Sequence, residues 1–389
     1  MAEWLSIIGF GEDGPDGLTR ASLDALNAAE VVFGGPRHLA MVDHPDKRPW
    51  PVPFAIEPVL ALRGRRVAVL ASGDPFWHGA GGVLAQALER EEWRAYPVPS
   101  VVSLAAARMG WRLEQVLCLG LHAAPLARLR RHLAPGVRAI VTVGDAPALA
   151  GWLVTQGFGA TRMTVMERLG GPHERLREAH AATFDLTGID RLVTVALEVA
   201  GTGRVFSRAS GLADDLFDHD GQITKRPIRA LAMSALAPRP GEMLWDIGAG
   251  SGSVGIEWLL ADATTRCIGI EADPVRAARA RANAARMGVD LDLRDGLARD
   301  VLPGLPRPDA VFLGGGADTA LMTELWDILP PGTRLVAHAV TLESEALLTI
   351  WQARAGGNLL RIELSEAAPL GRKRGWRASY PVVQWHVTK

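Results

Sequence analysis

A short apolar run followed by closely spaced glycines is the stretch of this sequence best suited to hold a ligand. The run ends at Asp246 and Ile247, the glycines are Gly248, Gly250 and Gly252, and an amphipathic helix pattern follows. Glycine tolerates a positive φ and has no Cβ, so a ligand can approach the backbone closely. The free N–H groups of the helix start would then point into the turn. The stretch predicts a nucleotide-type ligand site at a strand–loop–helix junction.

Two kinds of nucleotide cofactor fit this loop. Gly250 to Gly255 matches the G-x-G-x-x-G dinucleotide fingerprint, so a nicotinamide or flavin enzyme stays an alternative. That fingerprint should begin where the strand ends, whereas Asp246 to Ala249 intervene here. The carboxylate of Asp246 would repel a pyrophosphate and attract an ammonium or sulfonium group. The register therefore favours S-adenosylmethionine.

Acidic residues also end the next two apolar runs. Glu271 follows the run from Cys267 to Ile270, and Asp295 follows the run that starts at Leu291. The carboxyl ends of parallel strands meet at one edge of a sheet, so three acids would surround one ligand. Asp246 would lie near the methionyl amine, Glu271 would take the ribose hydroxyls, and Asp295 would lie near the adenine amine. Glu271 alone would fit NAD equally well.

The reacting end of the site is expected at the tips of two later strands. One apolar run ends in Gly314-Gly315-Gly316, which leaves room for a bulky substrate and offers backbone donors; a plain glycine turn is the alternative. The other run contains His338, which fits a packed strand histidine as well as a catalytic one. Glu343, a polar residue at that strand's tip, is the better candidate. The predicted catalytic residues are Gly314, Gly315, His338 and Glu343.

A basic run near the C-terminus joins two strand patterns, 359–364 and 382–387. Its arginines, Arg372, Arg374 and Arg377, could grip a substrate that bears several carboxylates, since forked guanidiniums match carboxylate geometry. A solvated hairpin tip is the other interpretation of such a run.

Composition restricts the class of protein. A chain of 389 residues exceeds the size at which one hydrophobic core usually stops growing, so two domains are expected. The net charge of −1 gives no attraction to nucleic acid, and no uncharged apolar run is long enough for a membrane span. The only cysteines, Cys118 and Cys267, form neither a disulfide framework nor a zinc site. We expect a cytoplasmic protein without a metal.

The N-terminal half alternates strand and helix patterns and carries two further glycine turns. Gly9-x-Gly11 with Leu18-Thr19, the turn at 34–38, Ser72-Gly73-Asp74-Pro75 and the segment 99–103 resemble the tetrapyrrole methyltransferase family. The resemblance implies a two-lobed α/β fold, known as class III, that binds S-adenosylmethionine between its lobes. The cofactor residues that it implies are Gly9, Gly11, Gly73, Asp74, Ser103 and the backbone near Leu121.

One departure from that family concerns the first glycine turn. Many members have Pro-Gly after the second glycine, whereas this chain has Glu12-Asp13. The segment faces the tetrapyrrole pocket in those relatives, so the departure bears on substrate contacts.

The C-terminal half resembles the decarboxylating precorrin methyltransferase domain of cobalamin synthesis, through Thr224, the glycine loop, Glu271, the glycine tip and Thr341-Leu342-Glu343. This implies a Rossmann-like class I methyltransferase fold. The cofactor residues expected in this half are Thr224, Asp246, Gly248, Ala249, Gly250, Ser251, Gly252, Glu271, Asp295 and Gly296.

The order of the two halves resembles the fused decarboxylating precorrin methyltransferases. The expected domains are 1–204 for methylation at C5, and 205–389 for methylation at C15 with decarboxylation of the C12 acetate. The implied substrate is a reduced tetrapyrrole, precorrin-6Y/6B, which becomes precorrin-8X; a homo-oligomer is also expected. The alternative is a methyltransferase for RNA or protein with a non-catalytic N-terminal assembly module. The bulk charge and the absence of an Asn-Pro-Pro motif weigh against that alternative.

Overall fold

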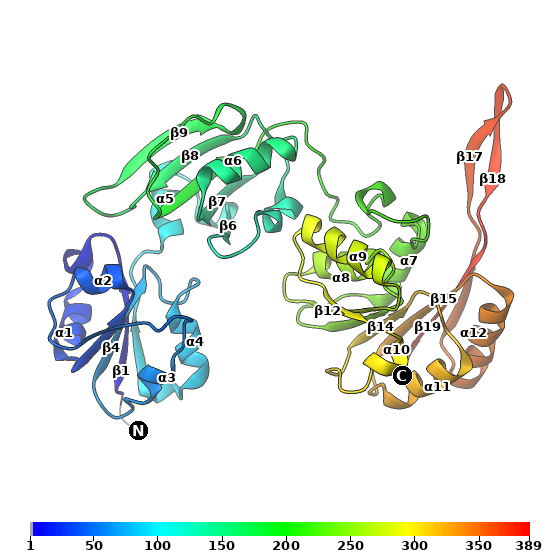
Figure 1. The fold of residues 1–389 in the computed structure, drawn as a ribbon, viewed down its shortest axis with the longest axis horizontal. Helices are drawn as coiled ribbons and strands as arrows, with labels where there is room; N and C mark the ends of the chain where they lie inside the picture. Colours follow the sequence, from blue (N-terminus) through cyan, green and yellow to red (C-terminus); the bar gives the residue numbers. More distant parts are fainter. Residues whose placement is uncertain (1–2) are drawn as a thin grey trace. The chain divides into compact units, whose positions relative to one another are not determined.

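The structure, a computed structural model, describes residues 3–389. The chain divides into two compact units, which Figure 1 draws in blue to green and in green to red. The first unit runs to Leu126 and resumes at Leu133–Arg204, and the second comprises Ala127–His132 and Val205–Lys389. Within residues 3–389, no helix combines the length and the apolar character that spanning a membrane requires.

The first lobe of unit 1 is a parallel five-stranded sheet with the order β3-β2-β4-β1-β5. Its strands are β1 (Leu5–Phe10), β2 (Val31–Gly34), β3 (Lys47–Pro49), β4 (Val67–Ser72) and β5 (Trp93–Tyr96). Its helices are α1 (Arg20–Ala28), α2 (Pro36–Ala40), α3 (Glu57–Leu60) and α4 (Ala80–Ala87). Helices cover both faces, which explains why β1 and β4 are apolar nearly throughout. Thr19 caps α1, since its side chain accepts a hydrogen bond from the Ser22 N–H.

The second lobe of unit 1 is a mixed sheet with the order β6-β7-β10-β8-β9, in which only β6 and β7 are parallel neighbours. Its strands are β6 (Leu117–Gly120), β7 (Arg138–Val143), β8 (Arg162–Glu167), β9 (Arg175–His180) and β10 (Val193–Glu198). Helix α5 (Val101–Met109) packs on β7 and β10, and α6 (Ala146–Thr155) is the second helix of the lobe.

Unit 2 is built on a seven-stranded sheet with the order β13-β12-β11-β14-β15-β19-β16. The strands are β11 (Met243–Ile247), β12 (Arg266–Glu271), β13 (Asp292–Asp295), β14 (Ala310–Leu313), β15 (Arg334–Ala339), β16 (Asn358–Ile362) and β19 (Val382–Thr388). The five strands from β13 to β15 are parallel, while β19 is antiparallel to both β15 and β16. The order reverses beside β11, and ligands bind at such a switch point in open α/β sheets.

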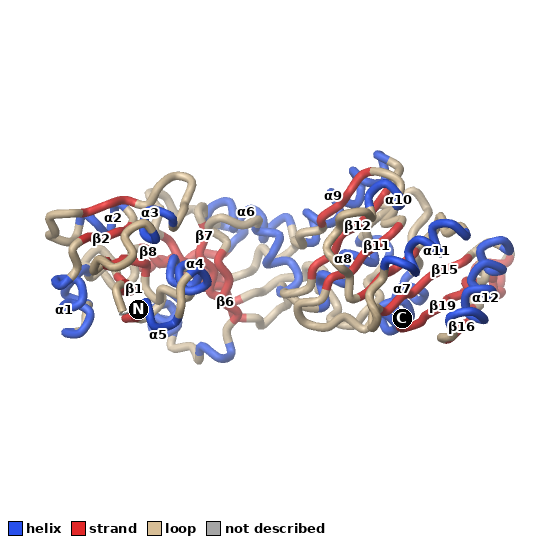
Figure 2. Tube along the Cα trace, turned by 90° about the horizontal axis from the view of Figure 1, so that it is seen from below, coloured by secondary structure: helices blue, strands red, loops and turns tan. Residues whose placement is uncertain are grey.

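Helices cover both faces of this sheet, as Figure 2 shows in blue beside the red strands. One face carries α7 (Arg226–Leu236), α8 (Ser253–Ala261) and α9 (Pro274–Met287). The other carries α10 (Ala298–Val301), α11 (Thr319–Ile328) and α12 (Leu342–Ala355). Trp385 of β19 is fully buried against the second set, so the strand that returns last completes the core.

A separate hairpin, β17 (Ser365–Leu370) with β18 (Lys373–Ala378), lies between β16 and β19 in the chain. Figure 1 shows it as a long ribbon that extends away from the sheet. The strand patterns at 359–364 and 382–387 are confirmed as β16 and β19. The basic run is not the simple tip between them, because most of it forms β18. The residues of β17 and β18 are largely exposed on both faces of the hairpin, and Trp376 is 80% exposed. No alternation of apolar and polar residues therefore marked these two strands in the sequence.

The polar passage that follows Arg204 is fastened to unit 2 by a buried ion pair. Arg229, on α7, has no exposed surface and pairs with Glu257 at 2.6 Å and with Asp214 at 3.1 Å. Glu257 also accepts hydrogen bonds from the N–H groups of Gly211 and Leu212, at 2.7 and 2.8 Å. The residues from Gly211 onward are therefore part of the second fold.

Candidate active sites

The glycine loop of unit 2 connects β11 to α8 with three residues in the left-handed region. Gly248, Gly250 and Gly252 have φ of +73°, +57° and +75°. The N–H groups of Gly248 and Ala249 both donate to the Ile270 carbonyl, at 2.9 and 3.0 Å. A left-handed backbone is unfavourable for residues with a Cβ, which is why glycines occupy these positions. The loop is thereby folded against the end of β12.

The strand register brings the three predicted acids to one edge of the sheet. Ile247 pairs with Ile270, and Glu271 pairs with Asp295, so β11, β12 and β13 end side by side. The prediction that these strand ends are neighbours is confirmed. The three side chains nevertheless have different surroundings.

Asp246 is 1% exposed and lies beneath the start of α8. Its carboxylate accepts a hydrogen bond from the Gly255 N–H at 2.9 Å. Burial raises the pKa of Asp246 to about 7; the Gly255 hydrogen bond opposes this rise and the charge of Glu271 adds to it. Asp246 therefore braces the loop from inside, and its contact with a methionyl amine stays a prediction.

Glu271 is 8% exposed, and both of its carboxylate oxygens accept backbone hydrogen bonds. One oxygen accepts from the Gly250 N–H at 2.7 Å, and the other accepts from the Asp273 N–H at 2.9 Å. Asp295 is exposed and pairs with Arg281 at 2.8 Å. The adjacent Gly296 donates its N–H to the Glu271 carbonyl at 3.0 Å.

The residues of the loop leave room for a cofactor. The hydroxyl of Ser251 is buried and has no hydrogen-bond partner among residues 3–389. A Cβ added at Gly250 would have only the Gly248 carbonyl oxygen near it, at 4.0 Å. A buried unpartnered hydroxyl beside open backbone suits a polar ligand, so the site fits a nucleotide-type cofactor. Thr224 is half-buried just before α7, and its carbonyl oxygen accepts a hydrogen bond from the Arg229 guanidinium.

The glycine tip after β14 lies against the glycine loop. Gly314 donates its N–H to the Ile247 carbonyl at 3.0 Å, and the Gly315 carbonyl oxygen is 3.3 Å from the position of a Cβ on Gly248. A Cβ on Gly315 itself would have no described atom within 4 Å. The structure thus joins the predicted cofactor loop to the predicted reacting tip, with open space above Gly315.

The other predicted catalytic residues differ in exposure. Glu343 is exposed in the first turn of α12. His338 is buried, with its Nε2 2.9 Å from Gln384 Oε1 and its ring edge-on to Phe312 at 5.0 Å. Burial lowers the pKa of His338, which keeps the ring neutral. Its surroundings explain the residue as part of the sheet, and a catalytic role stays a prediction.

The three predicted substrate arginines are exposed on the β17–β18 hairpin. Arg374 and Arg377 lie on β18, and Arg372 lies in the turn before it. The hairpin leaves the sheet from β16, the edge strand opposite β13. The sheet order therefore does not bring these arginines together with the glycine loop, which lies among β11, β12 and β13.

In unit 1, the structure brings the predicted cofactor residues of the first lobe together. A Cβ on Gly9 would lie 2.2 Å from the Gly73 carbonyl oxygen. Only glycine at position 9 therefore allows β1 and the loop after β4 to approach this closely. Gly73 has φ +59°, and a Cβ on Gly73 would lie 3.1 Å from Ser100 Cα. Ser100 caps α5 and its hydroxyl is 2.9 Å from that of Ser103.

The remaining predicted residues surround the same loop. Asp74 accepts a hydrogen bond from the Phe76 N–H at 2.9 Å, and Gly11 lies beside the Asp13 carboxylate. Leu121 is buried at the end of β6, where its N–H donates to Thr142. The ring of His78, just beyond the Gly73 loop, is 3.0 Å from a Cβ position on Gly120. This contact brings the two lobes together beside Leu121.

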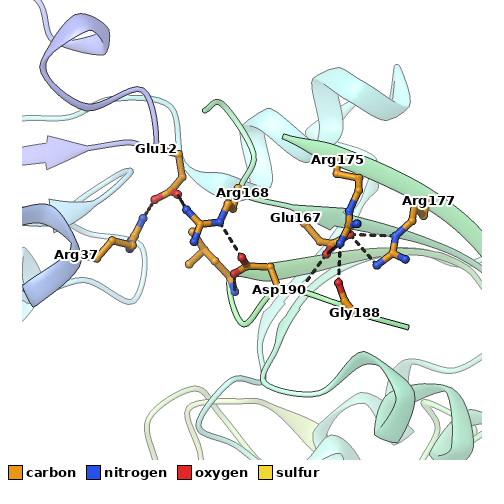
Figure 3. A network of polar contacts seen from close by, with 9 residues as sticks. Glu12, Arg37, Glu167, Arg168, Arg175, Arg177, Gly188 and Asp190 are labelled. Atoms are coloured by element: carbon orange, nitrogen blue, oxygen red, sulfur yellow. Dashed lines mark hydrogen bonds and ion pairs between the residues drawn. The ribbon is translucent and has the colours of Figure 1, made fainter. Parts of the chain in front are cut away.

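A network of charged residues that the sequence did not reveal also joins the lobes (Figure 3). Glu12 forms ion pairs with Arg37 of α2 and with Arg168, which follows β8. Arg168 pairs in turn with Asp190 at 2.7 Å. Arg168 and Asp190 line a pocket of about 350 Å³. The only sequence signal was the unusual Glu12-Asp13 pair, because the partners of Glu12 are distant in the chain.

Comparisons with known proteins match the two halves of the chain to two different families. The tetrapyrrole (corrin/porphyrin) methylases match residues 5–185, and the precorrin methyltransferase domain matches residues 215–389. The chain is 46% identical to the precorrin-6Y C(5,15)-methyltransferase (decarboxylating) of Sinorhizobium sp, over 100% of this chain and 97% of the relative.

Two shorter proteins resemble part of the chain. The cobalt-precorrin-6B C(15)-methyltransferase (decarboxylating) of Salmonella typhimurium is 32% identical, over 44% of this chain and 92% of the relative. The crystal structure of the C-terminal domain of precorrin-6Y C5,15-methyltransferase from Rhodobacter capsulatus is 52% identical, covers 47% of this chain and 100% of that chain, and has a TM-score of 0.46.

Proposed function

The chain belongs to the family of decarboxylating precorrin-6Y C5,15-methyltransferases of cobalamin biosynthesis, and from that premise we propose how its two units divide the reaction. The enzyme methylates its precorrin at C5 and C15 and removes carbon dioxide from an acetate side chain. Unit 1 methylates C5. Unit 2 methylates C15 and decarboxylates the C12 acetate. The alternative substrates, RNA and protein, are not favoured by a relative that matches over the whole chain.

The observation that supports this division is the open space above Gly315, next to the cofactor loop of unit 2. A ring carbon that is methylated there can carry a neighbouring side chain into the same space. The Salmonella typhimurium relative, which matches less than half of this chain, is named for C15 methylation and decarboxylation alone. Both steps therefore fit within one domain.

We assign one S-adenosylmethionine to each unit. The cofactor supplies an electrophilic methyl group on sulfur. In unit 2, Glu271 takes the ribose hydroxyls, Asp246 provides negative charge under the methionyl end, and Asp295 lies at the adenine end. Thr224, Ala249, Ser251 and Gly296 complete the cradle. In unit 1, the loop of Gly73 and Asp74 binds the cofactor together with Gly9, Gly11, Ser103 and the Leu121 backbone.

The protein contributes alignment and charge to the chemistry of unit 2. An electron-rich ring carbon would take the methyl group as the bond between that methyl group and the sulfonium sulfur breaks, so that a neutral thioether leaves and an iminium remains in the ring. The bond between the acetate methylene and its carboxylate then breaks, its electron pair neutralises the iminium, and carbon dioxide departs. The Gly314 and Gly315 backbone borders the ring, Glu343 steers the acetate or moves a proton, and neutral His338 supports the tip.

Two further properties belong to the proposal. The hairpin residues Arg372, Arg374 and Arg377 hold substrate carboxylates, and because the chain alone leaves them at the far edge of the sheet, we expect them to act in a homo-oligomer. Cys118 and Cys267 are both free thiols, which supports the reducing cytoplasm as the site of action.

The test fills the space above Gly315 in the full-length chain. Gly315 does not have a positive φ, so Gly315→Leu adds bulk without backbone strain. The variant should gain the C5 methyl group only and should retain the acetate carboxylate. The control Gly151→Leu, in α6, also adds a side chain where no described atom is close, and should give the complete product.

A second variant covers the possibility that C5 methylation must follow C15 methylation. Asp74→Ala should stop C5 methylation while C15 methylation and decarboxylation continue. A mixture of the two variant proteins should then restore the complete product, as mass spectrometry would show. Loss of carbon dioxide by Gly315→Leu alone would contradict the division.

A further inference from the structure

Glu12 lies at the ligand-binding edge of the first lobe, between two arginines (Figure 3). It follows β1, where the carboxyl ends of the parallel strands meet. Arg37 follows β2 and donates a hydrogen bond to the Ser72 hydroxyl at 3.1 Å, directly before Gly73 of the proposed cofactor loop. Arg168 comes from the second lobe, with its NH1 3.5 Å from Glu12 Oε2. The three residues thus lie beside the proposed cofactor loop of unit 1.

The two guanidiniums need an anion between them. Burial lowers the pKa of Arg37, and the charge of Arg168 lowers it further, so the two cations are close enough to repel. The side chain of Glu12 is only 8% exposed, whereas those of Arg37 and Arg168 are 34% and 39% exposed. The shared carboxylate is therefore covered while its two partners remain open to solvent. With Asp190 included, the group of four charges is neutral.

The neighbouring arginines, Arg175 and Arg177, already form ion pairs with a carboxylate of the protein. Glu167 accepts hydrogen bonds from Arg175 at 2.9 Å and from Arg177 at 3.1 Å, and from the Asp190 N–H at 2.8 Å. Among the described residues, Glu167 forms ion pairs with Arg175 and Arg177, whereas Arg168 pairs with Glu12 and Asp190. Arg168 also lines the pocket of about 350 Å³, so its guanidinium can be reached from outside.

The backbone at Arg168 is held in an unfavourable conformation. Its φ of +48° lies in the left-handed region, which a residue with a long side chain rarely adopts. The same turn contains Gly171, where a Cβ would lie 2.5 Å from the Glu12 Cβ. The turn is therefore pressed against Glu12, and the unusual backbone aims the Arg168 side chain at it.

We propose that Glu12 holds the place of a substrate carboxylate between Arg37 and Arg168, and that this pair of arginines selects carboxylate-bearing tetrapyrroles at the C5 site. A carboxylate of the entering ring replaces Glu12 as the shared anion, since each guanidinium fork matches a carboxylate. Glu12 thereby sets the affinity of the site by competing with the substrate. The inference rests on the proposed C5 activity of unit 1.

The test is the kinetics of C5 methylation by full-length Glu12→Gln, with an isotopically labelled methyl donor and NMR to distinguish the two new methyl groups. The amide keeps the shape of Glu12 and removes its charge. The KM for the tetrapyrrole should fall by about fivefold, a change typical of one partly exposed ion pair. An unchanged or increased KM would overturn the proposal.

Arg168→Gly removes the guanidinium and relieves the left-handed backbone. We expect the KM to rise about fivefold or more, with no loss of thermal stability. A lower melting temperature with an unchanged KM would show that the network only fastens the lobes together. In the double variant, Glu12→Gln should no longer lower the KM, because one member of the binding pair is absent.

The matched control is Glu30→Gln. Glu30 precedes β2 at the opposite edge of the same sheet and also pairs with two arginines, Arg65 at 3.2 Å and Arg66 at 3.6 Å. Glu30→Gln should leave the KM unchanged. If it lowers the KM as much as Glu12→Gln does, the effect comes from the net charge of the protein and the proposal is wrong. If Asp74→Ala still forms the C5 methyl group, the proposed function of unit 1 fails. If Asp74→Ala loses that methyl group and Glu12→Gln leaves the KM unchanged, only this inference fails.

Discussion

The carboxylate of Glu271 accepts a hydrogen bond of 2.7 Å from the backbone N–H of Gly250. This bond joins the end of β12 to the middle of the glycine loop. A cofactor whose ribose hydroxyls bind the same carboxylate must share it with the loop or take it over. If Glu271 binds the cofactor as proposed, one side chain couples the conformation of the loop to cofactor binding.

The first prediction follows from this coupling. Glu271→Ala should weaken S-adenosylmethionine binding to unit 2 by about 1.5–3 kcal/mol, the usual range for hydrogen bonds to a charged group. Glu271→Gln should lose less, because the amide oxygen can still accept from Gly250. Calorimetry measures the affinity, and Glu366→Ala on the exposed hairpin serves as a control. If Glu271→Gln does not fold, the residue is structural.

The second prediction concerns stoichiometry. Each unit has its own glycine turns, so the intact chain should bind about two S-adenosylmethionine molecules in a titration. Glu271→Ala should remove or weaken only one of these sites. A wild-type protein with a single site, abolished by Glu271→Ala, would mean that unit 1 does not bind the cofactor on its own.

The third prediction is a pH dependence that originates at Asp246. Its pKa rises from 3.8 to about 7 in the folded state, so the folded protein holds a proton that the unfolded chain has released. Asp246 thus stabilises the fold below about pH 4, and this contribution is lost as the pH rises through about 7, by at most about 4 kcal/mol.

Asp246→Asn provides the measurement. The amide oxygen can still accept from Gly255 but cannot ionise, so this part of the pH dependence should disappear. Urea unfolding of both proteins between about pH 4 and pH 8 should show the wild type losing stability relative to the variant. Parallel stability curves would mean that Asp246 is ionised throughout.

The fourth prediction concerns the basic hairpin. Replacing Arg372 and Arg374 with Gln should raise the KM for the tetrapyrrole while cofactor affinity and stability stay unchanged, since both side chains are exposed. The measurement belongs at low salt, where surface charges act most strongly. Arg65→Gln with Arg66→Gln removes the same charge from the first lobe and serves as the control. An unchanged KM would mean that these arginines do not bind substrate and that the basic run is only a solvent-exposed strand.

The fifth prediction uses the division of the chain. A cut between Arg204 and Val205 should give a C-terminal piece that methylates C15 and releases carbon dioxide, and an N-terminal piece that methylates C5. The position matters, because residues from Gly211 onward bind Glu257 and Arg229. A cut after Phe217 should destabilise the C-terminal piece by leaving buried Arg229 with fewer partners. Product masses identify each activity.

Much of unit 2 could be predicted because local signals and the tertiary fold agree there. Glycines, a preceding apolar run and a following helix pattern mark the loop at Gly248–Gly252, and parallel strands place Glu271 beside it. Side-chain environment was less accessible. Asp246 and Asp295 both lie near the ends of their strands, yet Asp246 is buried and Asp295 is exposed. In the sheet register Asp246 is level with Leu293, two positions before Asp295. Burial depends on which strand is central, and strand order is not a local property.

The contacts that sequence could not supply are those between distant residues without periodicity. Glu12 and Arg168 are separated by 156 positions, and their approach depends on the packing of two lobes. The face of His338 depended on a register that only its neighbours Phe312 and Gln384 define. Strands β17 and β18 bury neither face, so hydrophobic alternation could not identify them.

The position of the hairpin has a consequence for how this enzyme can change. Ile362 and Val382 are paired neighbours in the β16–β19 ladder, so the intervening residues are an insertion at a place where a tight turn would suffice. They can be lengthened, shortened or rebuilt without altering a hydrogen bond of the seven-stranded sheet. Sequence drift in this arm therefore leaves the backbone that carries the glycine loop and the glycine tip of unit 2 intact.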